Sequence, residues 1–334
     1  MMKLDARNVS WDDVKLFLAC ARAPSLRAAA TELNVSSSTI VRRMEKFEAS
    51  VGATLFDRLP NGVRLSTDGR RLIDAAQKLE EGAYELQRSI ETFEPARQGT
   101  VRISIMDGLG TFWVMPRLVE FQRANPGLVV DLQCADRSAD VLRLEADIAV
   151  QYTKPDDADL ICTRLGSMHI YPFASRRYLE IYGTPRNPTD IANHRLVEQV
   201  APQIDPDAIP RELGFASVAD LVGIRTNSSA ANFYAIEKGA GIGGLPTYAK
   251  ALGAAVEPVD IGVSNTVDIW LTYHPASRKT PRIATVIDWV KGCFDQKAFP
   301  WFQDKLIHPN EFAKMEPQRW KNNIGNETLI GRGT

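Results

Sequence analysis

Residues 25–52 of this 334-residue chain read SLRAAATELNVSSSTIVRRMEKFEASVG. Apolar side chains recur by threes and fours first at Leu26, Ala29, Ala30 and Leu33, and then at Ile40, Met44, Phe47 and Val51. Each set lines one face of a helix. Asn34-Val35 interrupts the pattern between them, and Ser36 is a suitable N-cap for the second helix. The stretch therefore predicts two short helices joined by a tight turn.

The outward face of the second predicted helix is small, polar and basic. At about 100° per residue, Ser38, Arg42 and Ala49 lie nearly opposite the apolar stripe. Small residues allow a close approach to the major groove, where Arg42 can contact a phosphate or a guanine edge. We expect DNA contacts from Ser36, Ser37, Ser38, Thr39, Arg42, Arg43 and Lys46. The alternative is an ordinary helical hairpin with a solvated face, because this spacing is common.

A short hairpin follows the two helices. Pro60-Asn61-Gly62 is a turn signal, and Val63 to Leu65 alternates like a strand. A helix-turn-helix followed by a hairpin predicts a winged helix, here over residues 1–66 with a further helix from Trp11 to Arg22. The wing arginines, Arg58 and Arg64, flank the turn and would contact phosphates or the minor groove. The alternative is a solvated surface hairpin.

Composition restricts the function classes. Lys+Arg 40 nearly balances Asp+Glu 41, so any charge that binds DNA must be local. The four cysteines are scattered, without a CxxC pair or a Cys/His cluster, so we expect no metal, no disulfide and no cofactor. Residues 1–10 do not resemble a secretory signal, and no apolar run is long enough to span a bilayer. The expected location is the cytoplasm, without a membrane partner.

A long helix is predicted over residues 67–94, with Ser66-Thr67 at its start. Its apolar residues alternate by fours and threes at Leu72, Ala76, Leu79, Ala83, Leu86, Ile90 and Phe93. A heptad repeat of about three heptads predicts a partner helix. The residues expected in this dimerisation seam are Leu72, Leu79, Ala83, Leu86 and Ile90. The alternative is an amphipathic helix that packs on its own chain.

Strands and helices alternate after a hinge at residues 95–99. Strands are predicted at 101–105, 128–134, 148–152, 170–175, 222–226, 242–245 and 268–273. Helices are predicted at 112–124, 141–144, 178–182, 189–193, 230–238 and 281–294. This rhythm favours a mostly parallel sheet with helices on its faces, in two small α/β units over residues 100–295 with a ligand cleft between them. The tail, residues 296–334, has aromatic residues at Trp301, Phe302, Phe312 and Trp320. These residues could pack on the two α/β units or on a neighbouring subunit, or the tail could be partly loose.

Two strand-to-helix junctions are expected to face one another across this cleft. The candidate effector-binding residues are Met106, Asp107 and Gly108, Gln151, and Asn227, Ser228 and Ser229. Free backbone N–H groups at the helix start near Ser229 suit an anion. Asp107 would oppose an anion if it points inward, so we expect a neutral polar ligand or an anion with its own donor. The alternative is that Ser228 and Ser229 only cap a helix.

The chain resembles the LysR-type transcriptional regulators from about Trp11 to Phe294. The matching pieces are FLACARAPSLRAAATELNVSSSTIVRRMEKFEASVGATLFDR, GVRLSTDG, FASRRYLEIYGTPRNPTDIANHR and GAGIGGLP, in this order. The resemblance implies a winged helix-turn-helix, a linker helix and a two-lobed effector domain like the periplasmic binding proteins. It also implies double-stranded DNA and a small-molecule effector as partners, and a homodimer or homotetramer.

The recognition helix departs from the family pattern at two places. Ser37-Ser38 stand where the family commonly has Gln-Pro, and Val41 stands where it commonly has Ser before the residue that matches Arg42. These departures leave the groove-binding role intact and put the preferred base sequence in doubt.

Other motifs suggest different chemistry. The glycines of GAGIGG, residues 239–244, would bind a dinucleotide only between a strand and a following helix, and the predicted order here is the reverse. His169 and His194 lack a nucleophile or a metal-ligand spacing, so surface or hydrogen-bonded histidines are favoured. A redox role for Cys162 or Cys293 is a minor hypothesis.

Three functions remain after this reading. The first is a DNA-binding regulator that responds to an effector. The second is a constitutive repressor whose lobes bind nothing. The third is an enzyme or binding protein with an accessory helical domain, which predicts a catalytic constellation or a secretion signal. Neither is found, so we do not expect an enzyme.

Overall fold

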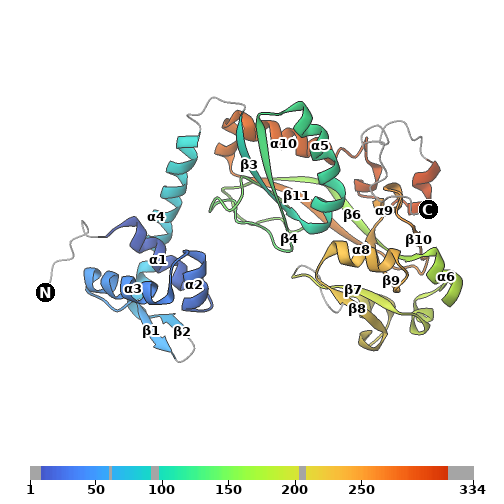
Figure 1. Cartoon of the computed structure of the whole chain (residues 1–334), viewed down its shortest axis with the longest axis horizontal. Helices are drawn as coiled ribbons and strands as arrows, with labels where there is room; N and C mark the ends of the chain where they lie inside the picture. Colours follow the sequence, from blue (N-terminus) through green and yellow to red (C-terminus); the bar gives the residue numbers. More distant parts are fainter. Residues whose placement is uncertain (1–8, 60–61, 92–97, 203–207, 315–334) are drawn as a thin grey trace. The chain divides into compact units, whose positions relative to one another are not determined.

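The computed structural model describes residues 9–59, 62–91, 98–202 and 208–314. The chain divides into two compact units, residues 1–91 and 92–334 (Figure 1). Four predictions lie outside the described residues: the turn at Pro60-Asn61, the linker helix beyond Glu91, most of the hinge, and the packing of Trp320. Within the described part of the chain, every helix is too short or too polar to cross a membrane.

The first unit begins with three helices, each capped by a serine. Its elements are α1 (Trp11–Arg22), α2 (Leu26–Glu32), α3 (Ser37–Val51), β1 (Phe56–Leu59), β2 (Gly62–Leu65) and α4 (Thr67–Glu91). The side chains of Ser10, Ser25 and Ser36 accept hydrogen bonds from backbone N–H groups in the first turns of α1, α2 and α3. Gly52 ends α3 at φ 70°, a left-handed conformation that glycine adopts without strain.

The predicted apolar faces form the core of this unit. Phe17 of α1 and Ile40 and Phe47 of α3 are buried together with Phe56 of β1. The ring centroids of Phe17 and Phe56 lie 5.5 Å apart. β1 pairs with β2 in antiparallel register, with Arg58 opposite Val63. The winged helix-turn-helix is therefore confirmed.

The first half of α4 belongs to this core. Ala76 is buried, and Leu72 packs against the same cluster. Arg22 at the end of α1 makes a two-pronged ion pair with buried Glu80, at 2.8 and 2.5 Å. The charge-assisted bonds satisfy Glu80 in its buried position, so the ion pair anchors α4 to α1.

The second unit is built on one sheet. Its strands are β3 (Gly99–Met106), β4 (Leu128–Ala135), β5 (Ile148–Gln151), β6 (Ile161–Ser175), β7 (Leu196–Gln199), β8 (Val222–Thr226), β9 (Ile242–Pro246), β10 (Val256–Pro258) and β11 (Asn265–Tyr273). Its α-helices are α5 (Met115–Ala124), α6 (Arg176–Tyr182), α7 (Ala208–Leu213), α8 (Ser229–Glu237), α9 (Tyr248–Ala251) and α10 (Pro281–Cys293). Short 3₁₀ helices lie at Pro188–Asn193, Ala219–Leu221, Pro275–Lys279, Pro300–Phe302 and Pro309–Lys314.

The strand order is β4-β3-β5-β11-β6-β9-β7-β8, with β10 beside β6. Strands β4, β3 and β5 are parallel, as are β8, β7 and β9, and these two halves form the two predicted lobes. The long strands β6 and β11 join them and run antiparallel to each other and to their neighbours β5 and β9. The expectation of a mostly parallel sheet thus holds within each lobe and is wrong for the strands that connect the lobes.

Three local predictions differ from the structure. Residues 141–144 form a turn instead of a helix, and Leu144 has a left-handed φ of 57°, which no helix allows. The predicted helix at 112–124 starts earlier, as a π-helix over Leu109–Val114 that continues into α5. The strand predicted from Ile170 begins at Ile161, because its first half pairs with β11.

The start of the C-terminal extension packs on its own chain. Trp301, Phe302 and Phe312 are buried in the core of the first lobe. The Trp113 ring at the centre of this cluster lies 5.0 Å from the Phe302 ring and 3.3 Å from the guanidinium carbon of Arg117. Burial lowers the pKa of Arg117 to about 10. Of the two packing alternatives for this segment, the described residues therefore favour the lobes of the same chain.

Candidate functional site

The outward face of α3 is exposed, as the sequence predicts. Ser37, Ser38, Arg42 and Lys46 are exposed, whereas Ile40, Met44 and Phe47 are buried on the opposite side. Among the described residues, neither Arg42 nor Lys46 forms an ion pair, so both cations are available to a polyanion. This arrangement suits insertion of α3 into a groove.

The remaining polar residues of α3 have structural partners. The Ser36 hydroxyl caps the helix by accepting from the Thr39 N–H at 3.1 Å, and it also lies within hydrogen-bond distance of the Ser38 and Thr39 hydroxyls. Arg43 is half-buried and donates to the Asp12 carbonyl at 3.1 Å. Arg43 and Ser36 therefore position the helix, besides any contact with DNA.

The two wing arginines are exposed and paired. Arg58 donates to Glu45 of α3, and Arg64 lies 3.5 Å from Asp57. The Arg58–Glu45 pair links the wing to α3 and offsets the negative charge on its outward face. Exposed ion pairs are weak, so a phosphate can compete for these guanidinium groups.

The second half of α4 presents an apolar seam. Leu79, Leu86 and Ile90 are 49%, 64% and 55% exposed, although each follows the heptad spacing. Ala83 lies between them and is half-buried. Large apolar side chains in a regular row on a helix indicate a packing partner.

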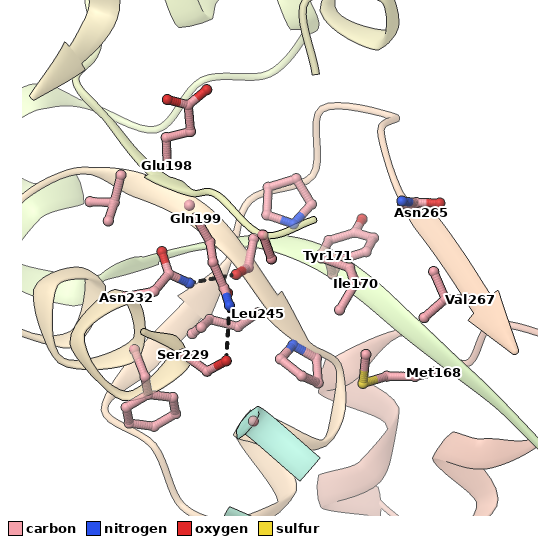
Figure 2. Close-up of a pocket in the computed structure, with 18 of the residues that line it drawn as sticks. Met168, Ile170, Tyr171, Glu198, Gln199, Ser229, Asn232, Leu245, Asn265 and Val267 are labelled. Carbon is pink, nitrogen blue, oxygen red and sulfur yellow. Dashed lines mark hydrogen bonds between the residues drawn. The ribbon is translucent and has the colours of Figure 1, made fainter. Parts of the chain in front are cut away.

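A cavity of about 610 Å³ lies between the two lobes of the second unit. Figure 2 shows Ile170 and Tyr171 on β6, Val267 and Asn265 on β11, and Ser229 and Asn232 on α8 around it. Its size is typical of a small-molecule site. The two predicted junctions meet here: Met106, Asp107, Gly108, Asn227 and Ser229 all line the cavity.

The two junctions touch directly. The Asp107 carboxylate accepts a hydrogen bond from the Ser229 N–H, with an oxygen–nitrogen distance of 2.9 Å. A Cβ atom at Gly108 would lie 3.2 Å from the Ser229 hydroxyl, so glycine permits this close approach. Asp107 therefore occupies the start of α8 and caps that helix from the other lobe.

Two predicted effector residues are placed elsewhere. Gln151 and Ser228 are not among the cavity-lining residues; Gln151 donates to the Thr153 carbonyl, and Ser228 caps α8 by accepting from the Ala231 N–H. The capping alternative thus describes Ser228. Lining residues that sequence reasoning missed include Phe112, Met168, Ile170, Tyr171, Gln199, Asn232, Leu245 and Tyr248. Local sequence patterns gave no signal for these residues, because the segments that surround the cavity are far apart in the sequence.

Two buried polar atoms of the cavity lining have no partner in the described structure. Asn232 is 2% exposed, and its Oδ1 atom makes no hydrogen bond, while its Nδ2 atom donates to the Gly244 carbonyl at 3.1 Å. The hydroxyl of Tyr248 is also buried without a partner. Buried polar atoms normally have a hydrogen-bond partner, so we expect these two atoms to bond to a ligand or to water.

The other candidate chemistry is not supported. His169 bonds to Thr266 and to the Gln303 carbonyl, and His194 bonds to Tyr178, so both are hydrogen-bonded structural histidines. GAGIGG follows α8 and enters β9, the order opposite to a dinucleotide fingerprint. Burial raises the pKa of Cys293 to about 12, which disfavours a reactive thiolate.

Two family models match this chain. Residues 11–70 match the bacterial regulatory helix-turn-helix protein model of the lysR family, and residues 95–294 match the LysR substrate binding domain. The two matches together span the winged helix and the two lobes described above.

Relatives and solved structures agree with these matches. The chain is 26% identical over 294 residues to the glycine cleavage system transcriptional activator of Escherichia coli, covering 86% of this chain and 95% of that protein. It is 27% identical over 184 residues to an HTH-type transcriptional regulator of Xanthomonas campestris, but this match spans only 55% of this chain and 54% of the relative. The fold is similar to that of full-length AphB, a virulence activator of Vibrio cholerae, with a TM-score of 0.55 and 20% identity over 85% of this chain and 99% of that one. The chain therefore belongs to the LysR family of transcriptional regulators.

Proposed function

We propose that the chain binds double-stranded DNA through the outward face of α3, with the wing arginines on the flanking backbone. The observation that carries this proposal is the exposed pair Arg42 and Lys46 on a helix whose other face is buried. We further propose that α4 pairs with its copy in a homodimer, within which two DNA-binding heads would match a two-fold symmetric site, and that the protein acts in the cytoplasm.

The effector site of this proposal is the cavity between the lobes. A ligand there contacts both lobes, so it shifts their arrangement by the difference between its affinities for the two states. The carbonyl and carboxylate groups at the cavity serve recognition of a ligand and carry no catalytic role in this proposal.

A gel-shift assay with the DNA adjoining the protein's own gene tests the proposal. Excess unrelated DNA of the same length serves as competitor. We expect a retarded band that survives the competitor, and complete loss of the band to the competitor would contradict sequence-specific binding.

One observation favours a regulator that acts without a ligand: Asp107 already joins the two lobes by bonding to Ser229. Titration calorimetry of the full chain with pooled metabolites separates the two functions. Saturable heat supports the effector-responsive regulator, and its absence with intact DNA binding supports the constitutive one.

A further inference from the structure

The start of α8 has little donor capacity left for a ligand. The Ser229 N–H donates to Asp107, the Ala231 N–H donates to the Ser228 hydroxyl, and the Ser228 N–H donates to the Thr226 hydroxyl. A helix start of this kind is ordinarily an anion site, because its free N–H groups and its dipole attract negative charge. Here the protein's own carboxylate fills that position.

Asn232, one turn further along α8, offers an acceptor. Its orientation is fixed, because the Gly244 carbonyl can only accept and so requires the Nδ2 atom on that side. The Oδ1 atom is then the end left without a partner among the described residues, and it is buried beside the cavity that Asn232 helps to line. A ligand satisfies this atom only by bringing an N–H or O–H donor. The Tyr248 hydroxyl does not show whether the ligand brings a donor or an acceptor, because a phenol hydroxyl can both donate and accept.

The charges around the cavity also favour a ligand that donates hydrogen bonds. Acidic side chains line it at Asp107, Asp136, Glu198 and Glu212, and Arg211 is the single basic side chain among the described lining residues. Glu198 is paired with Arg225, whereas Asp107 bonds directly to the first residue of α8. A carboxylate ligand would meet repulsion here, whereas a cation would be attracted.

The rest of the lining is apolar. Met168, Ile170 and Tyr171 on β6 lie beside Val267 on β11, and Leu245 of β9 lies between Asn232 and Ser229 of α8 in this view (Figure 2). Such a wall gains free energy by covering a hydrocarbon or aromatic body. The ligand is therefore expected to be amphipathic.

We propose that the effector is a protonated amine or amidine with an apolar body. Its N–H groups bond to the Oδ1 atom of Asn232 and to the carboxylate of Asp107, and its apolar body covers the wall formed by β6 and β11. This inference deepens the proposed function and rests on it, since it names the ligand class of the same cavity.

Three probes that share a phenylethyl skeleton test the ligand class: phenethylamine, 2-phenylethanol and 3-phenylpropanoate. Isothermal titration calorimetry of the full chain with each compound measures the charge preference at constant apolar area. We expect the amine to bind about tenfold more tightly than the carboxylate, with the alcohol between them. Equal or tighter binding of the carboxylate, or an amine without saturable heat, overturns the proposal.

Asp107→Asn tests whether the carboxylate of Asp107 is the charge that attracts the amine. The asparagine Oδ1 atom can still accept from the Ser229 N–H, so the contact between the lobes is retained while the charge is removed. We expect amine affinity to fall about tenfold and alcohol affinity to stay constant. Asp131→Asn, which changes a half-buried carboxylate of the same lobe that pairs with Arg102 outside the cavity lining, is the matched control and should change neither.

Unchanged amine affinity in Asp107→Asn contradicts the placement. A gel shift on the same preparations separates this failure from that of the proposed function. Intact DNA binding with a reversed ligand order rejects only the ligand class, and absent DNA binding rejects the regulator itself.

Discussion

We propose that DNA recognition depends most on Arg42. It is exposed on α3 and free of ion pairs among the described residues, whereas its neighbour Arg43 is held by Asp12. Sequence periodicity alone predicted the exposure of Arg42, because the apolar stripe fixes which face of the helix is buried. Periodicity did not separate Arg42 from Arg43, because the partner of Arg43 lies 31 positions away in α1.

Arg42→Ala should weaken specific DNA binding by about 1–3 kcal/mol if the guanidinium reads a base. The fold should be retained, since the side chain is exposed. Fluorescence anisotropy with the natural operator measures the effect. Arg71→Ala is the control, because Arg71 is an exposed arginine of α4 whose single ion pair among the described residues is with Asp68. Unchanged affinity in Arg42→Ala would remove this side chain from the interface.

His194 makes stability depend on pH. The Tyr178 hydroxyl accepts from the Arg195 N–H and lies 3.3 Å from His194 Nδ1, where either atom can be the donor. Burial lowers the pKa of His194 below its ordinary value of 6.5. The unfolded chain therefore binds the proton first as pH falls. The stability that the neutral ring provides is complete above pH 6.5 and declines below it.

His194→Gln should reduce this pH dependence, because glutamine does not titrate. Urea unfolding of both proteins between about pH 7 and pH 5 measures it. The loss of unfolding free energy over this range should be smaller in the variant than in the wild type. Parallel losses in the two proteins would show that His194 is not the group responsible.

At the scale of single elements, α4 has two roles along its length. Ala76 and Glu80 pack into the winged helix, whereas Leu79, Leu86 and Ile90 form an exposed seam that begins beside Glu80 and continues toward the end of the helix. The heptad pattern predicts all the apolar residues of α4 as one seam and does not separate the buried residues from the exposed ones. The division arises because α1 and β2 pack against one part of α4, where Leu72 and Ala76 join the core of the winged helix.

Leu79→Asp or Leu86→Asp should dissociate the proposed dimer, because a carboxylate is costly in a dry helix pair. DNA affinity should fall as well, since two half-sites are no longer held together. Gln87→Asp introduces the same charge at an exposed position beside the seam and should leave the dimer intact. Sedimentation equilibrium distinguishes the variants, and dimers that persist in both leucine variants would exclude this seam.

The start of the C-terminal extension acts as a structural part of the first lobe. Phe302 is fully buried between Trp113 and Phe294, with ring centroids 5.0 Å away on each side. Phe302→Ala should lower the unfolding free energy by about 3–5 kcal/mol. Lys305→Ala, at an exposed position of the same segment, is the control. A loss below about 1 kcal/mol in Phe302→Ala would mean that the segment contributes little to the lobe.

Prediction from sequence succeeded where the signal is local. Helices α1 and α3 were placed from apolar spacing and serine caps, and the two junctions at Asp107 and Ser229 were placed from strand ends. The cavity wall could not be predicted, because β6 and β11 pair across about 100 residues. The bond between Asp107 and Ser229 spans 122 residues and depends on the same pairing.

For the whole molecule, the central claim is a dimer that reads two half-sites through a pair of α3 helices. Hydroxyl-radical footprinting on the DNA adjoining the protein's own gene tests it most directly. We expect two protected patches on one face of the duplex, with centres about 10 base pairs or a multiple of that apart. Protection should be lost from both patches together in Leu86→Asp. A single protected patch, or two that persist in that variant, would contradict the claim.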